Sequence, residues 1–309
     1  MPSLTSAVSA MLGVSCLLGT ASADSTNDLL GPREIAVGEA MRGGATGASA
    51  ISMNPAGLPL NRELVFEGGY GWRGSDDATL IGVSACDSTN AAPGCFFYDY
   101  LGTNPELAGG MSGARRTHVG GMALSRQLLP RVMVGATMKY FSFKSDMAGE
   151  TSESGFTADF GATLRMTQMI NIGLAAQNLY QGEESPMFPR TLGAGLHARP
   201  MPNLSIGFDA RWLSDVDDVG KSIRYGGGAE LFLSGSRGQS GYPLRLGALR
   251  DDGVGSTYVS GGLGMATLKW SIDIAARREV KGGDETMVLA SMRFWGPREA
   301  SPSIDQPID

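Results

Sequence analysis

From about residue 63 onward, the chain is built of short segments in which apolar and polar residues alternate. In the stretch 156–165 every even position is apolar, whereas the odd positions are Thr, Asp, Gly, Thr and Arg. The same alternation recurs at 204–212 and 270–277. A period of two is typical of a β-strand with one apolar and one polar face. Because the chain contains almost nothing else for these apolar faces to pack against, the pattern predicts a barrel whose apolar side faces lipid.

The connections between the predicted strands alternate between short turns and longer polar loops. Bacterial outer-membrane barrels have short periplasmic turns, longer external loops and an even number of strands. We therefore predict an all-β fold: a single antiparallel transmembrane β-barrel of about 14 strands (63–295) in the outer membrane of a Gram-negative cell. The connection 234–241 does not fit this alternation, since it is long but falls at the end of the barrel where short turns are expected. Short turns are predicted at 129–131, 166–168, 200–202 and 267–269, and longer loops at 102–115, 144–154, 181–189 and 214–221.

Composition agrees with a crowded barrel interior. Glycine makes up 45 of 309 residues, which is roughly double its average share. Much of it falls on the polar face, where a narrow interior or the close approach of a plug would favour residues without side chains. The net charge of −6 argues against a nucleic-acid partner. The polar-face glycines include Gly161, Gly193, Gly195, Gly226 and Gly228.

Both ends of the chain lie outside this pattern. The first residues are typical of a secretory signal peptide (1–23), because a stretch of small apolar residues precedes Ala21-Ser22-Ala23, which fits an A-x-A cleavage site. A lipoprotein signal at Cys16 is the alternative, but Gly13 stands where such a signal has Leu. The Pro- and acid-rich end (296–309) is expected to be a disordered periplasmic tail.

Two cysteines remain after the predicted signal peptide. Cys86 and Cys95 flank a short loop. In an exported protein, such a pair most simply forms a disulfide that closes the loop. No histidine lies nearby, which weakens the metal or catalytic alternative. We expect no metal site and no cofactor.

The segment before the barrel has no strand periodicity. Pro55 prevents a helix from running through Met53-Asn54 and favours a turn, in which Gly57 is free to adopt a positive φ. One interpretation is a linker or cap that leads to the first strand. The other is a periplasmic N-terminus and plug (24–62) tucked into the barrel, whose small side chains let it pass the inner wall.

A Gly/Ala-rich run at 42–50, followed by Asn54-Pro55-Ala56-Gly57-Leu58 directly before an alternating strand, resembles the plug of FadL-type outer-membrane transporters of fatty acids and aromatic hydrocarbons. It resembles equally the related PorV/PorQ-like barrels, which serve protein secretion and surface attachment. The resemblance implies a barrel of about fourteen strands with a plug. This chain is markedly shorter than typical fatty-acid transporters, which argues against fatty acids specifically. The plug motif residues implied here are Arg42, Gly43, Asn54, Pro55, Ala56 and Gly57.

Ten charged residues fall on the predicted inner face. Opposite charges at comparable depths predict cross-strand ion pairs that fill a narrow interior. The functional alternative is a polar constriction that the plug opens and closes. The ten residues are Lys139, Asp159, Arg165, Asp209, Arg211, Arg224, Glu230, Arg245, Asp273 and Arg277.

The chain carries little that resembles a catalytic site. His118 and His197 are its only histidines, and no Ser/His/acid arrangement accompanies them, so we do not expect an enzyme. The leading hypothesis is passive uptake of small hydrophobic molecules through a FadL-like barrel. The rival is a non-transporting, PorV-like scaffold for protein secretion or surface attachment. The expected partners are outer-membrane lipid and either a hydrophobic small molecule or a secreted or surface protein, with the barrel itself monomeric.

Overall fold

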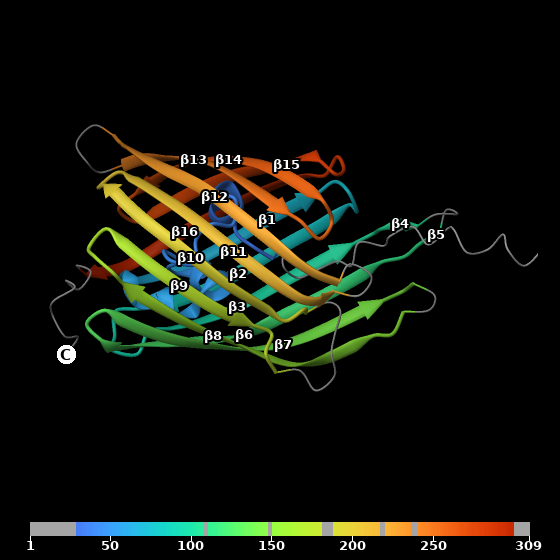
Figure 1. The fold of residues 1–309 in the computed structure, drawn as a ribbon, viewed down its shortest axis with the longest axis horizontal. Coiled ribbons are helices and arrows are strands. Elements are labelled where there is room, and N and C mark those ends of the chain that lie inside the picture. Colours follow the sequence, from blue (N-terminus) through green and yellow to red (C-terminus); the bar gives the residue numbers. More distant parts are fainter. Residues whose placement is uncertain are drawn as a thin grey trace, which may run out of the picture.

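The computed structural model describes residues 29–107, 111–147, 150–180, 188–216, 220–235 and 240–299. Fourteen antiparallel strands form a closed barrel, and each pairs with its neighbours along the chain until β1 meets β16 (Figure 1). The predicted fold is therefore confirmed. The wall strands are β1 (Arg62–Arg73), β2 (Ala78–Asp87), β3 (Gly94–Thr103), β6 (Arg115–Leu129), β7 (Val132–Ser145), β8 (Glu153–Arg165), β9 (Ile170–Gln177), β10 (Thr191–Met201), β11 (Leu204–Val216), β12 (Gly220–Ser234), β13 (Ser240–Asp251), β14 (Ser256–Thr267), β15 (Trp270–Lys281) and β16 (Thr286–Glu299).

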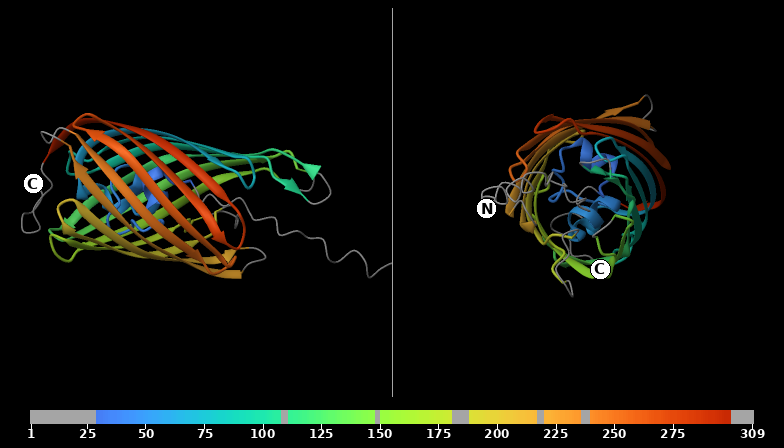
Figure 2. Two further views of the ribbon diagram at one scale, coloured as in Figure 1. Left: turned by 90° about the horizontal axis from the view of Figure 1, so that it is seen from above. Right: turned by 90° about the vertical axis from the view of Figure 1, so that its right-hand side faces the viewer.

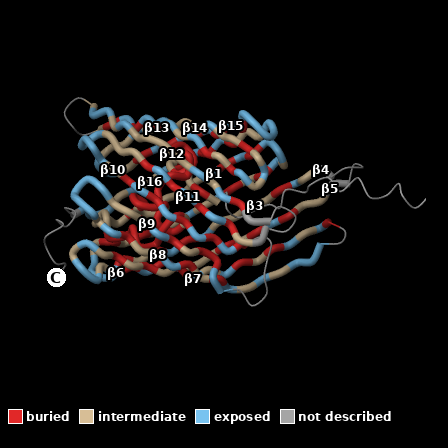
Figure 3. Tube along the Cα trace, in the orientation of Figure 1, coloured by how far each residue is buried: buried red, intermediate tan, exposed pale blue. Residues whose placement is uncertain are grey.

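Burial alternates along the strands as the sequence predicts, and Figure 3 shows buried and exposed positions following one another on the wall. Phe160 and Ile274 are 55% and 46% exposed on the outer face, whereas their neighbours Asp159 and Asp273 are 0% and 1% exposed inside. An apolar exterior around a polar interior is the pattern of a barrel embedded in lipid. The protein is thus an outer-membrane β-barrel.

None of the helices in the described part of the chain has the length and apolar character needed to span a membrane.

The barrel wall continues beyond its predicted C-terminal boundary. β16 ends at Glu299 rather than at residue 295, because Glu63 pairs with Arg298 and Arg62 with Glu299. The register shifts between Glu63 and Val65. The resulting bulge accommodates Pro297, which has no N–H to contribute to the ladder. The predicted tail beyond residue 299 and the predicted signal peptide lie outside the described residues.

The connections fall into two groups, one at each end of the barrel. The short-turn end carries the connections 88–93, 130–131, 166–169, 202–203, 235–239 and 268–269. The long-loop end carries 74–77, 104–114, 146–152, 178–190, 217–219, 252–255 and 282–285.

The predicted loop lengths are only partly right. The loop predicted at 214–221 is wrong in extent, because β11 and β12 continue to Val216 and Gly220, which pair with each other. The loop predicted at 102–115 contains a two-stranded sheet of β4 (Glu106–Leu107) and β5 (Met111–Ser112), which projects beyond the wall (Figure 1). Strand ladders therefore extend into segments whose polar composition indicated loops.

Residues 29–61 lie inside the barrel, and we call them the plug. They contain α1 (Pro32–Ala36), α2 (Ala48–Met53) and the 3₁₀ helix η2 (Pro55–Leu60). The end-on view in Figure 2 shows these short helices within the ring of strands. α1 packs on β13 to β16, and η2 packs on β6 to β9. The plug therefore contacts opposite parts of the wall.

Candidate functional site: the plug and the barrel lumen

Inward-facing glycines follow the path of the plug across seven consecutive strands, and we call them the glycine track. A Cβ atom on Gly207 would lie 1.9 Å from the carbonyl oxygen of Ala40, and one on Gly173 would lie 2.0 Å from that of Arg42. Both gaps are far too short for a real side chain, so the glycines let the plug backbone touch the wall. The track consists of Gly135, Gly161, Gly173, Gly193, Gly195, Gly207, Gly226, Gly228 and Gly247.

Asn54 of the predicted plug motif is fully buried and joins the plug to the wall. Its Nδ2 donates to the carbonyl oxygens of Arg42 (2.9 Å) and Ala162 (3.2 Å) and to Thr163 Oγ1 (3.0 Å). Its Oδ1 accepts from the N–H of Ala56 (3.1 Å), which caps the first turn of η2. The remaining motif residues fit around this junction: a Cβ on Gly57 would overlap Ala45, and Pro55 packs on the glycine track.

Arg42 and Asp209 form the central ion pair between plug and wall. Arg42 donates to Asp209 Oδ2 from its backbone N–H (3.0 Å) and from Nη1 (2.9 Å). Both side chains are almost fully buried, so the pair is shielded from solvent. Gly193 and Gly195 leave the room that these two side chains occupy.

Glu39 makes the second connection of this kind. It accepts from Arg211 of β11 (2.9 Å) and lies 3.3 Å from Arg277 of β15. Glu39 has a φ of 61°, in the left-handed region that non-glycine residues seldom adopt. One carboxylate thus ties the plug to two well-separated strands, and Arg277 also reaches Glu285 (2.7 Å) in the connection that follows β15.

A chain of alternating charges spans the short-turn end of the lumen. Glu230 pairs with Arg33 of the plug (3.3 Å) and with Arg245 (2.6 Å). Arg245 in turn pairs with Asp273 (2.5 Å), which Arg293 approaches to 3.9 Å. Arg293 also binds Glu67 at 2.8 Å. A cavity of about 370 Å³, which we call the polar vestibule, is lined by the members of this chain other than Glu67.

The other predicted lumen charges also lie on the inner face. Lys139 pairs with Asp159 (2.7 Å), and Arg224 pairs with Asp251. Arg165 is half-buried at the short-turn end of β8. The ten predicted residues therefore divide among several contacts rather than forming one network, and four of them, Asp209, Arg211, Glu230 and Arg277, hold the plug.

The sequence analysis missed several residues of this interior. Glu67 and Arg293 lie on inward positions of alternating strands, so the period-two pattern contained the signal for them. Arg33, Glu34 and Glu39 lie in the plug, where no periodicity shows which side chains face the wall.

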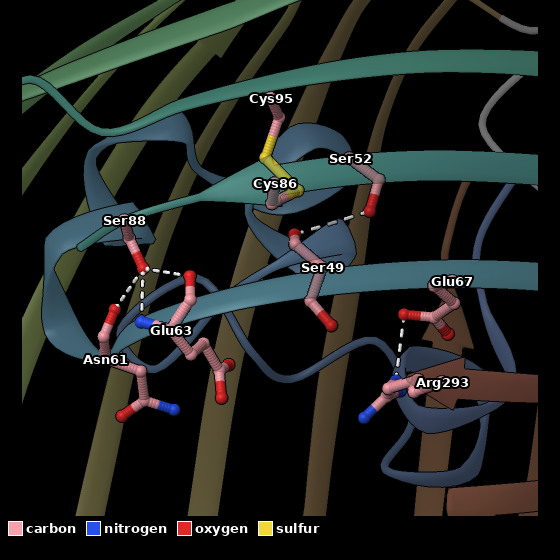
Figure 4. Close-up of a disulfide and its surroundings, with 9 residues drawn as sticks. All are labelled: Ser49, Ser52, Asn61, Glu63, Glu67, Cys86, Ser88, Cys95 and Arg293. Atoms are coloured by element: carbon pink, nitrogen blue, oxygen red, sulfur yellow. Dashed lines mark hydrogen bonds and ion pairs between the residues drawn. A yellow bond between two sulfur atoms is a disulfide. The ribbon is translucent and has the colours of Figure 1, made fainter. Parts of the chain in front are cut away.

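The predicted disulfide is confirmed, although it does more than close a loop. Cys86 and Cys95 are directly opposite each other on β2 and β3, with Cα atoms 4.0 Å apart. Figure 4 shows the sulfur atoms beside α2, which carries Ser49 and Ser52. Both cysteines belong to the buried cluster that contains Ile51, and so the disulfide is part of the surface against which the plug packs.

Two small cavities lie between the plug and the wall. The larger, of about 90 Å³, is lined mainly by apolar groups from the plug and from β1, β2, β3 and β16, and we call it the apolar cavity. An adjoining cavity of about 70 Å³ shares Leu29, Ile51 and Phe97 with it. Arg33 lines the polar vestibule, whereas the next residue, Glu34, lines the apolar cavity. α1 therefore separates an apolar compartment from a polar one.

The two histidines lie in different surroundings. His197 is buried against Gly43 and Gly44 of the plug, where its ring leaves no room for a Cβ on Gly44. His118 contacts Tyr98, with 2.7 Å between Nδ1 and the hydroxyl oxygen. Within the described ranges, no three or more His, Cys, Asp or Glu residues group in a way that could hold a metal ion.

At the long-loop end, the connection after β7 is fixed to the wall. Glu150 accepts from Arg115 Nε (3.0 Å) and from the Ser145 hydroxyl. Partial burial acts to raise the pKa of Glu150, but the hydrogen bonds from Arg115 and Ser145 and the charge of Arg115 together hold it below its usual range. The contact therefore persists at neutral pH.

Several solved structures share this architecture. The CymD monoaromatic hydrocarbon channel superposes with a TM-score of 0.67 at 11% identity, covering 86% of this chain and 97% of that one. The toluene transporter TodX of Pseudomonas putida gives 0.62 at 12% identity, covering 86% and 97%. A FadL homologue of Pseudomonas aeruginosa gives 0.65 at 10% identity, covering 85% and 98%.

The chain has the FadL-type fold. The resemblance seen at residues 42–58 is thus confirmed at the level of fold. No protein-family model matches the sequence, and no curated protein matches it. The PorV-like alternative gains no support from the FadL-type structures named above.

Proposed function

We propose that this FadL-like barrel is a passive channel for small hydrophobic molecules across the outer membrane. The observation that carries the proposal is the apolar cavity between the plug and the wall. Its lining includes Leu30, Ile51, Leu80, Phe97 and Leu289, which are all buried inside a barrel whose inner face also carries the ion pairs described above. Ligand sites are typically concave and mostly apolar, with a few polar groups.

The likeness in fold supports the same proposal. Two of the similar structures are a monoaromatic hydrocarbon channel and a toluene transporter. The apolar cavity and its neighbour together match the size of an engineered cavity of about 150 Å³ that holds benzene. A single aromatic ring is therefore a suitable cargo, whereas a long acyl chain is not.

The wall offers a direct test at two adjacent glycines. Gly69 faces inward and lines the apolar cavity, and a Cβ there would make only ordinary contacts, 3.4 Å from the carbonyl oxygen of Ala290 and 3.5 Å from Ser291 Cβ. A Gly69→Leu side chain therefore fits the wall but occupies the cavity. Gly68→Leu is the matched control, since Gly68 lies on the outer face with only Val83 within 4.0 Å.

We expect cells that express the wild-type barrel to take up radiolabelled toluene faster than cells with an empty vector. Gly69→Leu should slow this uptake by roughly tenfold, because the leucine side chain would fill most of the small cavity and exclude toluene. Gly68→Leu should leave it unchanged. The heat-modifiable gel shift verifies that both variants fold. Equal uptake by the two variants, or wild-type uptake no faster than the empty vector, would contradict the proposal.

A further inference from the structure

The apolar cavity contains polar groups that have no partner in the protein. Glu34 is only 2% exposed, and its Oε2 accepts no hydrogen bond among the described residues. Ser291 is 5% exposed, and its Oγ is likewise without a partner. Both residues line the same cavity. Leaving a buried acceptor unsatisfied costs about 1–3 kcal/mol, and more for a charged group, so two such atoms in one small cavity require a physical reason.

The charges around this cavity have one sign. Glu34, Glu67 and Asp99 line it, and none of its described lining residues is a lysine or an arginine. Two cations lie outside the lining, and one of them, Arg293, is near enough to Glu34 for their charges to interact. Arg293 is engaged with Glu67 (2.8 Å) and Asp273 (3.9 Å), and Lys139 with Asp159 (2.7 Å) and Asn178 Oδ1 (2.8 Å).

The arrangement discriminates between ligands by charge. A carboxylate ligand would face acidic side chains in a poorly hydrated site, where like charges repel strongly. A neutral hydrocarbon would leave the Glu34 acceptor unsatisfied. A ligand with an ammonium group would supply both a hydrogen-bond donor and the opposite charge, and a charge-assisted hydrogen bond of this kind is stronger than a neutral one.

We propose that the apolar cavity binds small hydrophobic amines, whose ammonium group donates to Glu34 Oε2 while the ring or short chain packs on Ile51, Phe97 and Leu289. Asp99 faces both adjoining cavities and offers a further hydrogen-bond acceptor where the ligand would extend. The Ser291 hydroxyl accepts a further ammonium N–H. This inference deepens the proposed function by naming the class of its cargo, and it rests on that function.

A series of nearly isosteric probes tests the proposal on the purified, detergent-solubilised protein. Benzylamine, toluene and benzoate differ mainly in charge. We expect isothermal titration calorimetry to show that the wild-type protein binds benzylamine about tenfold to a hundredfold more tightly than toluene, the range for one hydrogen bond to a charged group. Benzoate should bind more weakly than either probe.

Glu34→Gln removes the charge with little change in shape. It should abolish the preference for benzylamine and leave the affinity for toluene unchanged. Glu63→Gln is the matched control, because Glu63 lies on the rim and pairs with Arg298 outside the apolar cavity. If Glu34→Gln fails to fold, Asp99→Asn and Ser291→Ala should each weaken benzylamine binding severalfold.

Three outcomes would overturn the inference: no binding of benzylamine, benzoate bound at least as tightly as benzylamine, or a preference for benzylamine that all the variants retain. Benzylamine would fail to bind if the Glu34 carboxylate accepts its hydrogen bonds from water alone. Toluene uptake is measured separately. If toluene uptake occurs without any amine preference, the channel proposal stands and this inference falls. If the amine preference depends on Glu34 but uptake fails, the site stands and the transport proposal falls.

Discussion

Asn54 illustrates how one residue can hold two parts of a fold together. An asparagine side chain commonly holds a turn by bonding to the backbone two residues on, and the bond from Ala56 N–H to Asn54 Oδ1 does this. Its Nδ2 reaches Arg42 within the plug and Ala162 and Thr163 in β8. Nothing local in the sequence indicates these contacts, because they join positions as far apart as residues 54 and 163.

We therefore expect Asn54→Ala to lower the stability of the folded barrel by about 1–3 kcal/mol, since it leaves the Arg42 carbonyl oxygen without its donor in a buried site. The temperature midpoint of the heat-modifiable gel shift should fall accordingly. Asn203→Ala is the control, because Asn203 is exposed in the turn between β10 and β11. An unchanged midpoint for Asn54→Ala would show that the plug does not depend on this junction.

At the scale of elements, three deeply buried anchors hold the plug, in addition to the more exposed Arg33–Glu230 pair. Asn54 anchors it to β8, Arg42 to β11 through Asp209, and Glu39 to β11 and β15. The glycine track brings the backbone of the plug against the wall between these anchors. The anchors at Asn54 and Arg42 are bonded through backbone atoms as well as side chains, whereas Glu39 acts through its carboxylate alone.

Because Glu39 acts through its carboxylate alone, a substitution that removes this charge tests whether the plug can move and open the barrel. Glu39→Gln removes the charge that holds Arg211 and Arg277 and leaves the other two anchors in place. We expect the refolded variant to show a severalfold higher ion conductance in planar bilayers than the wild type, because a loosened plug admits water to a charged lumen. Glu279→Gln, which changes a wall carboxylate near the long-loop end, serves as the control. A folded Glu39→Gln barrel with wild-type conductance would contradict a movable plug.

The strands could be predicted from the sequence because their two faces have different environments. Alternation along the strand alone places Phe160 and Ile274 on the outer face and their neighbours Asp159 and Asp273 on the inner face. The polar-face glycines likewise indicated the close approach of another backbone. Two features could not be predicted, the extension of β16 through the bulge at Pro297 and the contacts of Glu34 and Glu39. The extension of β16 depends on its pairing with β1, which lies at the opposite end of the chain. The plug contacts depend on a segment whose sequence has no periodicity to show which side chains face the wall.

At the scale of the whole molecule, the two ends of the barrel differ in character. The short-turn end carries both the start of β1 and the end of β16, together with the polar vestibule. The long-loop end carries the projecting β4–β5 sheet and the longest connections, 104–114 and 178–190. Outer-membrane barrels have short turns on the periplasmic side and long loops outside. This asymmetry predicts the orientation of the channel in the membrane.

Single cysteines on intact cells test this orientation. In a background that lacks Cys86 and Cys95, a cysteine at Glu150 should react with a membrane-impermeant maleimide, because the connection 146–152 lies at the long-loop end. A cysteine at Thr167, in the turn between β8 and β9, should react only after the outer membrane is opened. Both positions are exposed in the folded chain, so a difference in labelling reports the side of the membrane rather than burial. Labelling at Thr167 without labelling at Glu150 would invert the barrel. The polar vestibule, which lies at the short-turn end, would then face the outside of the cell.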